Sequence, residues 1–234
     1  MEFCVSLAGV PVRVVHRYEH IRAICDEYLT DAEPLFTVSA SDEEIAAEMS
    51  ITNGEFPPAI CEGTCIHRAA TRGLVKHGVM LIHSAVITVD GEAYVFMAKS
   101  GVGKSTHIRL WQKVFGDSAV VLNGDKPYFT FEDGVLTAHG TPWRGKEHLG
   151  CNMKAPVRGM CLLHRGAENE ISPASSRDAV GHIFHQVLLP QDGLELATFM
   201  GMMDKIVKNV PFYNLYCNME DDAARVAYNG MKGN

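Results

Sequence analysis

Paired cysteines and long apolar runs are both missing from this sequence. Its seven cysteines are odd in number and scattered, and no two of them stand in a C-x-x-C spacing. This pattern argues against a disulfide framework and against a zinc ribbon, and it favours reduced thiols. No apolar stretch reaches the roughly 18 residues that a membrane span needs, and the first residues carry an early acid without a basic stretch. We therefore predict a cytoplasmic protein with neither a membrane span nor a signal peptide.

Positive charge is also scarce. The chain has 21 Lys and Arg against 28 Asp and Glu, which gives a formal net charge of -7. Proteins that bind nucleic acid non-specifically are usually basic, so we expect no nucleic-acid partner. An anionic ligand is still compatible with this charge, because backbone amides can hold a phosphate inside an acidic protein. Internal repeats and low-complexity segments are absent as well.

Turn signals divide the chain into two predicted domains. Residues 1–56 are expected to form a small N-terminal α+β unit, and residues 57–234 a larger domain. The boundary follows from the turn-rich residues 53–58, which interrupt the apolar pattern. In the N-terminal unit we expect two strands over 2–15, a helix over 18–29, a strand over 34–38 and a helix that starts at Ser41.

The larger domain is expected to mix strands and helices. The apolar run of residues 119–123 predicts a strand covered on both faces. Asp90 and Gly91 predict a tight hairpin between the two strands that precede residue 98. The expected strands cover residues 79–89, 93–97, 119–123, 128–132, 135–138, 157–163, 170–172 and 213–217, and the expected helices cover 59–77, 104–115, 176–189, 194–207 and 221–228.

Residues 98–106 carry the clearest chemical pattern. They match G-x-x-x-x-G-K-[ST] with Ala98 in place of the first glycine. In such a loop, glycines let successive backbone N–H groups point at a phosphate chain, and the following helix adds its positive end. The strand before the loop and the helix after it are the context that this mechanism requires. The competing interpretation is an ordinary strand–turn–helix connection. The predicted nucleotide-binding residues are Ser100, Gly101, Val102, Gly103, Lys104, Ser105 and Thr106.

Roles follow for individual side chains of and near this loop. Lys104 would reach the outer phosphates, and Ser105 would offer its hydroxyl to Mg²⁺. Asp125 follows the predicted strand 119–123, so it stands at a strand end where nucleotide ligands gather. A carboxylate there can hold Mg²⁺ or accept the proton of a substrate hydroxyl. The alternative for Asp125 is a simple turn.

Three segments together resemble a known family. Residues 83–86, 100–105 and 123–127 resemble the catalytic domain of the HPr kinase/phosphorylase superfamily, which is related to phosphoenolpyruvate carboxykinase. The resemblance covers roughly residues 78–165 and is strongest to a poorly characterised bacterial branch. It implies a mixed-sheet α/β kinase core with a phosphate loop, which uses ATP and Mg²⁺. Related enzymes often assemble, so the resemblance allows a homo-oligomer.

The resemblance also implies catalytic residues. His83 matches a histidine that lines the active site, and Asp125 matches an acid that takes part in magnesium binding and general-base work. With Lys104, these are the predicted catalytic residues. The family has two adjacent aspartates, but the first of them is Gly124 here, so a two-carboxylate site and reversible phosphorolysis are not expected. HPr itself is not an expected substrate.

A second group of functional side chains lies in residues 140–148. Cations, an acid, a histidine and an indole follow one another after a predicted strand, and such a loop can clamp a substrate or close over a nucleotide. The alternative is a solvated basic turn with one packed tryptophan. The substrate residues predicted from this loop are Trp143, Arg144, Lys146 and Glu147.

Other candidates are weaker. Arg165 follows a predicted strand and is interpreted as a surface charge in preference to a phosphate ligand. His182 and His185 have a spacing that can bind metal, but they are interpreted as histidines on a helix face. Cys61 and Cys65 are expected to be small core residues.

The predicted function is therefore an Mg-assisted, ATP-dependent kinase. It would transfer the γ-phosphate to a hydroxyl of a small molecule or of a peptide, and the acceptor stays open between the two. A nucleotide-binding regulatory module without catalysis is the alternative from another class. Carboxykinase activity is a third and weaker interpretation, because this chain is far shorter than those enzymes.

Overall fold

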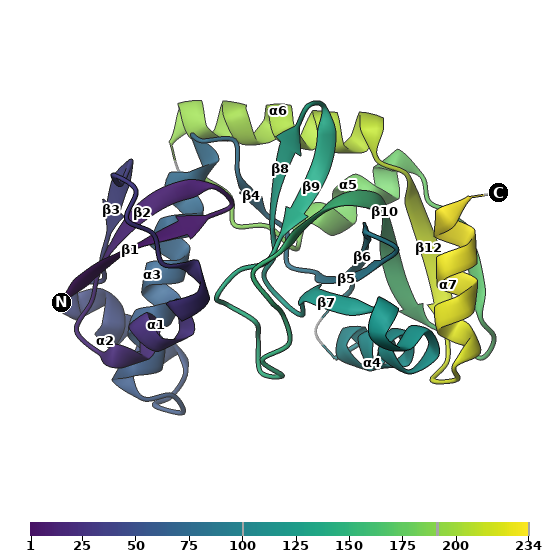
Figure 1. Cartoon of the computed structure of the whole chain (residues 1–234), viewed down its shortest axis with the longest axis horizontal. Helices are drawn as coiled ribbons and strands as arrows, with labels where there is room; N and C mark the ends of the chain where they lie inside the picture. Colours follow the sequence, from purple (N-terminus) through teal and green to yellow (C-terminus); the bar gives the residue numbers. More distant parts are fainter. Residues whose placement is uncertain (100, 191, 234) are drawn as a thin grey trace.

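The computed structural model describes residues 1–99, 101–190 and 192–233. It arranges the chain around two sheets of three and nine strands, with the smaller sheet near the N-terminus (Figure 1). Helices lie beside both sheets, and strands and helices alternate along much of the chain. The predicted mixed α/β architecture with a small N-terminal sheet is confirmed.

The small sheet starts from a tight hairpin. β1 (Glu2–Leu7) and β2 (Val10–Val15) pair antiparallel, and β3 (Phe36–Val38) pairs parallel with β2. Ala8 and Gly9 make the turn with positive φ angles of 49° and 82°. Two consecutive residues with positive φ give a turn whose twist matches that of the strands it joins.

A buried carboxylate holds the first helix of the N-terminal unit. α1 (Glu19–Ile24) is followed by a single 3-10 turn (Asp26–Tyr28), so the helix expected over 18–29 is split. The carboxylate of Glu62 accepts hydrogen bonds from the backbone N–H groups of Arg17 and Tyr18, at 2.7 and 3.0 Å. Glu62 is 1% exposed, whereas its two donor residues are exposed, so the two bonds are partly buried. They supply partners for N–H groups at the start of α1 that the helix itself cannot pair.

The next two helices begin where their sequences predict. α2 (Asp42–Ile51) has a capping box, in which Ser41 accepts from the Glu44 N–H while the Glu44 carboxylate accepts from the Ser41 N–H. α3 (Pro58–Val75) has proline in its first turn, where a missing N–H costs nothing. α3 is amphipathic and long, and it packs against α1, α2 and the small sheet.

One apolar cluster joins the N-terminal unit to the larger sheet. It contains Val12 and Ile21 from the N-terminal unit and Leu74 from α3. It also contains Tyr128 and Trp143 from the larger part of the chain. α3 therefore shares its core with both parts, and the division at residues 56 and 57 stays a prediction.

The larger sheet is a curled, mixed sheet. Its strands are β4 (Met80–Leu81), β5 (Ala85–Val89), β6 (Glu92–Met97), β7 (Val120–Asn123), β8 (Tyr128–Glu132), β9 (Val135–His139), β10 (Lys154–Arg165), β11 (Glu170–Pro173) and β12 (Phe212–Cys217). They follow the order β4-β8-β9-β10-β6-β5-β7, with β12 beside β10 and β11 beside β12. β10 pairs antiparallel with β9 through its first residues and parallel with β6 and β12 through its later ones. This change of partners along one strand curls the sheet.

The central strand β6 is buried on both faces. Val95 and Met97 point into one apolar cluster, and Tyr94 and Phe96 point into another. Such alternation is the geometry of any strand, and both faces are apolar here because helices cover both. β10 alternates between the same two clusters.

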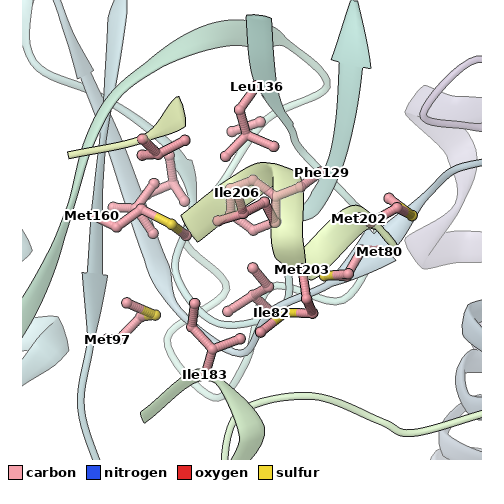
Figure 2. Packing of buried hydrophobic residues seen from close by; sticks show 14 of the residues in the cluster. Met80, Ile82, Met97, Phe129, Leu136, Met160, Ile183, Met202, Met203 and Ile206 are labelled. Atoms are coloured by element: carbon pink, nitrogen blue, oxygen red, sulfur yellow. The ribbon is translucent and has the colours of Figure 1, made fainter. Parts of the chain in front are cut away.

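Methionines are unusually common in the first of these clusters. α5 (Ser176–Phe184) and α6 (Gly193–Asn209) cover that face. Figure 2 shows the side chains of α6 meeting those of the sheet. Unbranched methionines fill irregular gaps, which suits a helix laid across a curled sheet. The five methionines of this cluster are Met80, Met97, Met160, Met202 and Met203.

Aromatic side chains dominate the opposite face. α4 (Lys104–Phe115) and α7 (Asp222–Lys232) cover it. Trp111 of α4 is fully buried, and its ring centroid lies 4.9 Å from that of Tyr94. α4 is thereby held against the end of β6, with its N-terminus at the turn that follows this strand.

The strand expected over residues 119–123 is present as β7 (Val120–Asn123), and both of its faces are covered except at Val120. β7 is an edge strand that pairs antiparallel with β5, and Val120 is 41% exposed. A run of apolar residues does not distinguish a central strand from an edge strand, because the hydrogen-bonding partners come from elsewhere in the chain. Ala119 and Val121 belong to one cluster and Leu122 to the other, so Val120 is the one exposed apolar residue of the run.

The cysteines agree with the expectation from the sequence. All seven cysteines are free, and Cys61 and Cys65 are buried as expected. Among the described residues no helix has the length and apolar character needed to cross a membrane.

Replacing Glu62 by alanine should destabilise the fold by about 1–3 kcal/mol, because two partly buried N–H groups lose their acceptor. Glu62→Gln keeps one acceptor oxygen and should lose less. Glu33→Ala, on an exposed loop, is the control and should change the free energy of unfolding by less than about 0.5 kcal/mol. Urea denaturation measures all three, and equal losses at positions 62 and 33 would contradict the buried cap.

Candidate active site

The predicted phosphate loop lies between β6 and α4. α4 begins at Lys104, as the sequence predicts, and Gly103 precedes it. Gly101 and Gly103 have φ angles of +79° and +131°, which residues with a Cβ rarely adopt. No heavy atom lies within 4 Å of an ideal Cβ at either position. These glycines are therefore required by backbone conformation, and open space adjoins them. Ser100 lies outside the described residues.

Lys104 folds back onto the loop. Its ammonium donates a hydrogen bond to the carbonyl oxygen of Ala98 at 3.0 Å. Burial lowers the pKa of Lys104, and the nearby charge of Asp125 opposes this effect. A partly desolvated ammonium at the start of a helix is well placed to bind an anion.

Arg165 stabilises the loop from the neighbouring strand. Its Nε donates to the carbonyl oxygen of Val102 at 3.1 Å, and a terminal nitrogen donates to that of Gly101. Along β10, Arg165 alternates with His164 and so shares the α4 side of the sheet with Leu163. Arg165 is exposed, as the interpretation as a surface charge expects, but that interpretation missed its two hydrogen bonds to the loop. The parallel pairing of β6 and β10 decides its position.

A cleft of about 450 Å³ opens beside the loop. The first turns of α4 and the carboxyl ends of β10 and β12 surround it. Thr106, from the predicted set, lines this cleft. Its apolar walls come from Val102, Leu110, Leu163 and Met219.

His83 and Asp125 meet at the other side of the loop. His83 Nε2 lies 2.7 Å from Asp125 Oδ1. The pairing of β5 with β7 explains this contact, because His83 precedes β5 and Asp125 follows the antiparallel β7. The Ser84 N–H also donates to the Asp125 carbonyl oxygen at 3.1 Å.

Opposing effects act on the pKa of Asp125. Burial would raise it, but the hydrogen bond and charge of His83, with the charges of Lys126 and Lys104, hold the pKa below its ordinary value of 3.8. Asp125 is therefore a carboxylate at neutral pH, close to one lysine of the loop and paired with a histidine. The three predicted catalytic residues are brought together.

Asn123 fixes the backbone beneath Asp125. Its side-chain oxygen accepts from the N–H groups of Asp125 and Lys126, at 2.9 and 2.7 Å. Its side-chain nitrogen donates to the Thr141 hydroxyl at 3.0 Å. Asn123 is fully buried. Sequence reasoning assigned it no role of its own, although an Asn-Gly-Asp turn is a signal for such a side-chain-to-backbone bond.

The loop that contains residues 140–148 passes close to Asp125. Gly145 has a φ of +71°, and an ideal Cβ there would lie 2.7 Å from Asp125 Cβ. At Gly140 an ideal Cβ would lie 1.9 Å from the Cys151 carbonyl oxygen. Glycine is required at both positions. At Gly140 the backbone passes close to that of Cys151, and at Gly145 it passes close to the Asp125 side chain.

The four predicted substrate residues of this loop have different environments. Trp143 is 8% exposed, its ring lies tilted against that of His67 with centroids 4.6 Å apart, and its indole N–H donates to the Gly63 carbonyl at 3.3 Å. This burial favours packing over the predicted substrate contact. Arg144 forms an ion pair with Glu27 of the N-terminal unit.

The remaining two substrate candidates are more accessible. Glu147 forms an ion pair with Arg109 of α4, and Lys146 is exposed. Ser105 is partly exposed at the start of α4. Among the described residues no group of three His, Cys, Asp or Glu side chains could hold a metal ion.

Comparisons with known proteins were made over the whole chain. No family model matches it, and no curated protein matches it. Among solved structures the chain is similar to the Hpr(Ser) kinase/phosphatase from Coxiella burnetii, with 7% identity and a TM-score of 0.37. The match covers 63% of this chain and 91% of that chain. At this level the likeness carries no argument about the site, whose chemistry rests on its own geometry.

Gly145→Ala should cost about 3 kcal/mol of stability, because it adds a clash with Asp125 to an unfavourable φ. Gly134→Ala is the matched control. Gly134 has a φ of +82° with nothing within 4 Å of an ideal Cβ, so it should cost only about 1 kcal/mol. Chemical denaturation measures the free energy of unfolding of both variants. Equal decreases would mean that the Asp125 side chain moves away from the new methyl group at no cost.

Asp125 should make the protein less stable in acid. Because its pKa is lowered in the folded state, its stabilising contribution is present at neutral pH and is lost as pH falls through and below 3.8. We expect the unfolding free energy of Asp125→Asn to fall less than that of the wild type between pH 6 and 3. Asp31→Asn, at an exposed position, is the control and should follow the wild type.

Proposed function

We propose that this protein is an Mg-assisted, ATP-dependent phosphotransferase. The observation that carries the proposal is the arrangement around the loop. A hydrogen-bonded His83–Asp125 pair lies within the electrostatic reach of Lys104, and a separate cleft opens on the other side of the same loop. The base and the terminal phosphate of a nucleotide lie far apart. The cleft would take the base, the His83–Asp125 side would take the terminal phosphate, and the loop backbone between them would bind the phosphate chain.

The residues present fit a nucleoside triphosphate. The glycines of the loop leave open space beside backbone N–H groups, and the N-terminus of α4 favours negative charge. The cleft offers apolar walls to a base, with Leu110 contributed by α4 and Met219 by the segment after β12. Arg165 would keep the loop carbonyls turned away from the phosphates, since it already donates hydrogen bonds to two of these carbonyl oxygens.

Ser105 and Asp125 are the residues that would hold Mg²⁺. A hydroxyl and a carboxylate are oxygen ligands of the kind that this ion prefers, and phosphate oxygens and water supply the remainder in nucleotide sites. The ion would neutralise charge on the phosphates when bound. Lys104 would leave the Ala98 carbonyl to contact the outer phosphates from the protein side.

Asp125 is the proposed general base. It is ionised at neutral pH and oriented by His83, so it can take the proton from an acceptor hydroxyl. The acceptor oxygen then forms a bond to the γ-phosphorus, while the bond from that phosphorus to the bridging oxygen of ADP breaks. Lys104 stabilises the charge that this transfer redistributes.

The acceptor is a hydroxyl compound, either a small molecule or a serine of a peptide. Incubation with radiolabelled ATP and cell extract, followed by separation of small molecules from polypeptides, distinguishes the two. In the first case the label moves to the small-molecule fraction, and in the second it stays with polypeptide.

A nucleotide-binding module without catalysis is the second candidate. Position 124 favours it, because the residue beside Asp125 is glycine. An ideal Cβ there would lie 3.3 Å from the Leu149 carbonyl oxygen, so a second acid does not fit without a shift of the loop. This candidate predicts ATP binding with no turnover against a broad mixture of metabolites and peptides.

Lys104→Ala should weaken ATP binding and reduce turnover by about 100-fold or more, because it removes the ammonium that contacts the outer phosphates. Lys113→Ala, on an exposed part of the same helix where Lys113 pairs with Asp221, is the control and should behave as the wild type. Isothermal titration with Mg·ATP and a turnover assay measure both effects. Normal turnover by Lys104→Ala would sink the assignment of the loop.

Asp125→Asn separates catalysis from binding. It should lower kcat by roughly 100- to 1,000-fold because the base is lost, while the affinity for nucleotide falls much less. Loss of affinity without loss of kcat would instead make Asp125 a ligand of the bound nucleotide only.

A further inference from the structure

Basic side chains gather beside the phosphate loop, on the α5 side of the sheet. Lys99 directly follows β6 and Ala98, His164 is the penultimate residue of β10, and His182 belongs to α5. Along β10, His164 alternates with Leu163 and shares its face with Leu162, which α5 covers. The ring centroids of His164 and His182 lie 6.0 Å apart, edge to face.

The ring of His164 is held in place by β12. It stacks on Tyr216 with centroids 4.7 Å apart, and its Nε2 lies 3.2 Å from Asn214 Oδ1. Since an amide oxygen only accepts, Nε2 donates in this contact. Nδ1 is then the ring atom that β12 does not engage.

Charge in this cluster is poorly balanced. The groups that act on His182 are His164, Lys99 and His185, all basic, and the single acid Asp178. Asp178 already accepts a hydrogen bond from the Ser175 hydroxyl at 2.7 Å. Burial first, and then the neighbouring basic groups, lower the pKa of His182. A bound anion would reverse that effect by favouring the charged ring.

The cluster also adjoins the proposed catalytic pair. The carbonyl oxygen of Gln186, just beyond α5, accepts a hydrogen bond from the His83 N–H at 2.7 Å. Helix α5 and the residues after it thus connect His182 with His83. The loop amides, Lys104 and α4, which would hold the triphosphate, lie toward the other face of the sheet.

We propose that Lys99, His164 and His182 form an anion site for the phosphate acceptor. The acceptor would then be a hydroxyl compound that also carries a phosphate or carboxylate, bound on the α5 side while its hydroxyl reaches Asp125. This inference rests on the proposed function, whose substrate class it narrows. A metal is a poorer occupant, because among the described residues this cluster does not provide three metal-ligating side chains.

Binding of inorganic phosphate to the full chain saturated with Mg²⁺ and a non-hydrolysable ATP analogue tests the site. With the loop occupied, we expect phosphate to bind as a second ligand in isothermal titration. His182→Ala and Lys99→Ala should each weaken this binding about 5- to 10-fold, through loss of one charge-assisted contact. His20→Ala, in the distant helix α1, is the control and should bind phosphate as the wild type does.

The pH dependence gives a second readout. Phosphate should bind more tightly at pH 6 than at pH 8 in the wild type, because binding is coupled to protonation of His182, whose ionisable neighbours are His164, His185, Lys99 and Asp178. His182→Ala should reduce this dependence. Circular dichroism confirms that each variant is folded before its affinity is compared.

Two outcomes would overturn the proposal. In one, phosphate only displaces the nucleotide analogue and never binds beside it. In the other, the variants at 99 and 182 bind phosphate as tightly as the wild type. If the analogue itself does not bind, the proposed function fails, and the comparison of variants with phosphate alone still decides whether the basic cluster is an anion site.

Discussion

The two-sided burial of β6 and β10 is the constraint on which this structure depends. Both strands alternate between a methionine-rich cluster under α5 and α6 and an aromatic cluster under α4 and α7. Because the strands run parallel, their carboxyl ends lie at one edge of the sheet. The predicted phosphate loop follows one strand, and His164 and Arg165 end the other. Apolar packing on both faces therefore brings the loop, His164 and Arg165 to one edge of the sheet.

The site is closed by contacts that reach far along the chain. Residues 140–151 pass against Asp125 at Gly145, and the same segment is tied to the N-terminal unit through Arg144 and Glu27. The Asn152 side chain adds a hydrogen bond to the Glu27 carbonyl at 2.6 Å. The N-terminal unit thus supports the loop that borders the proposed base. Its packing with α3 gives this support a rigid foundation.

Much of the fold could be predicted from the sequence, because its signals are local. The capping serine at 41, the hairpin turns at Asp90 and Asp133, and the helix that starts at Lys104 all follow from short-range chemistry. The exposed edge of β7 could not be predicted, since its apolar run looks the same in an edge strand as in a central one. The burial of Trp143 could not be predicted either, because its partners His67 and Gly63 lie about 80 positions earlier in the sequence.

The candidate site divides in the same way. The sequence by itself determined the glycine turn between β6 and α4, since its glycines and Lys104 stand in one short segment whose backbone requirements are local. It also marked His83 and Asp125 as candidates, but it did not show that they touch. Only the tertiary structure decided that contact, through the antiparallel pairing of β5 with β7. The same holds for Arg165 on the loop and for His164 beside His182, because strand pairing and helix packing join segments that no sequence spacing relates.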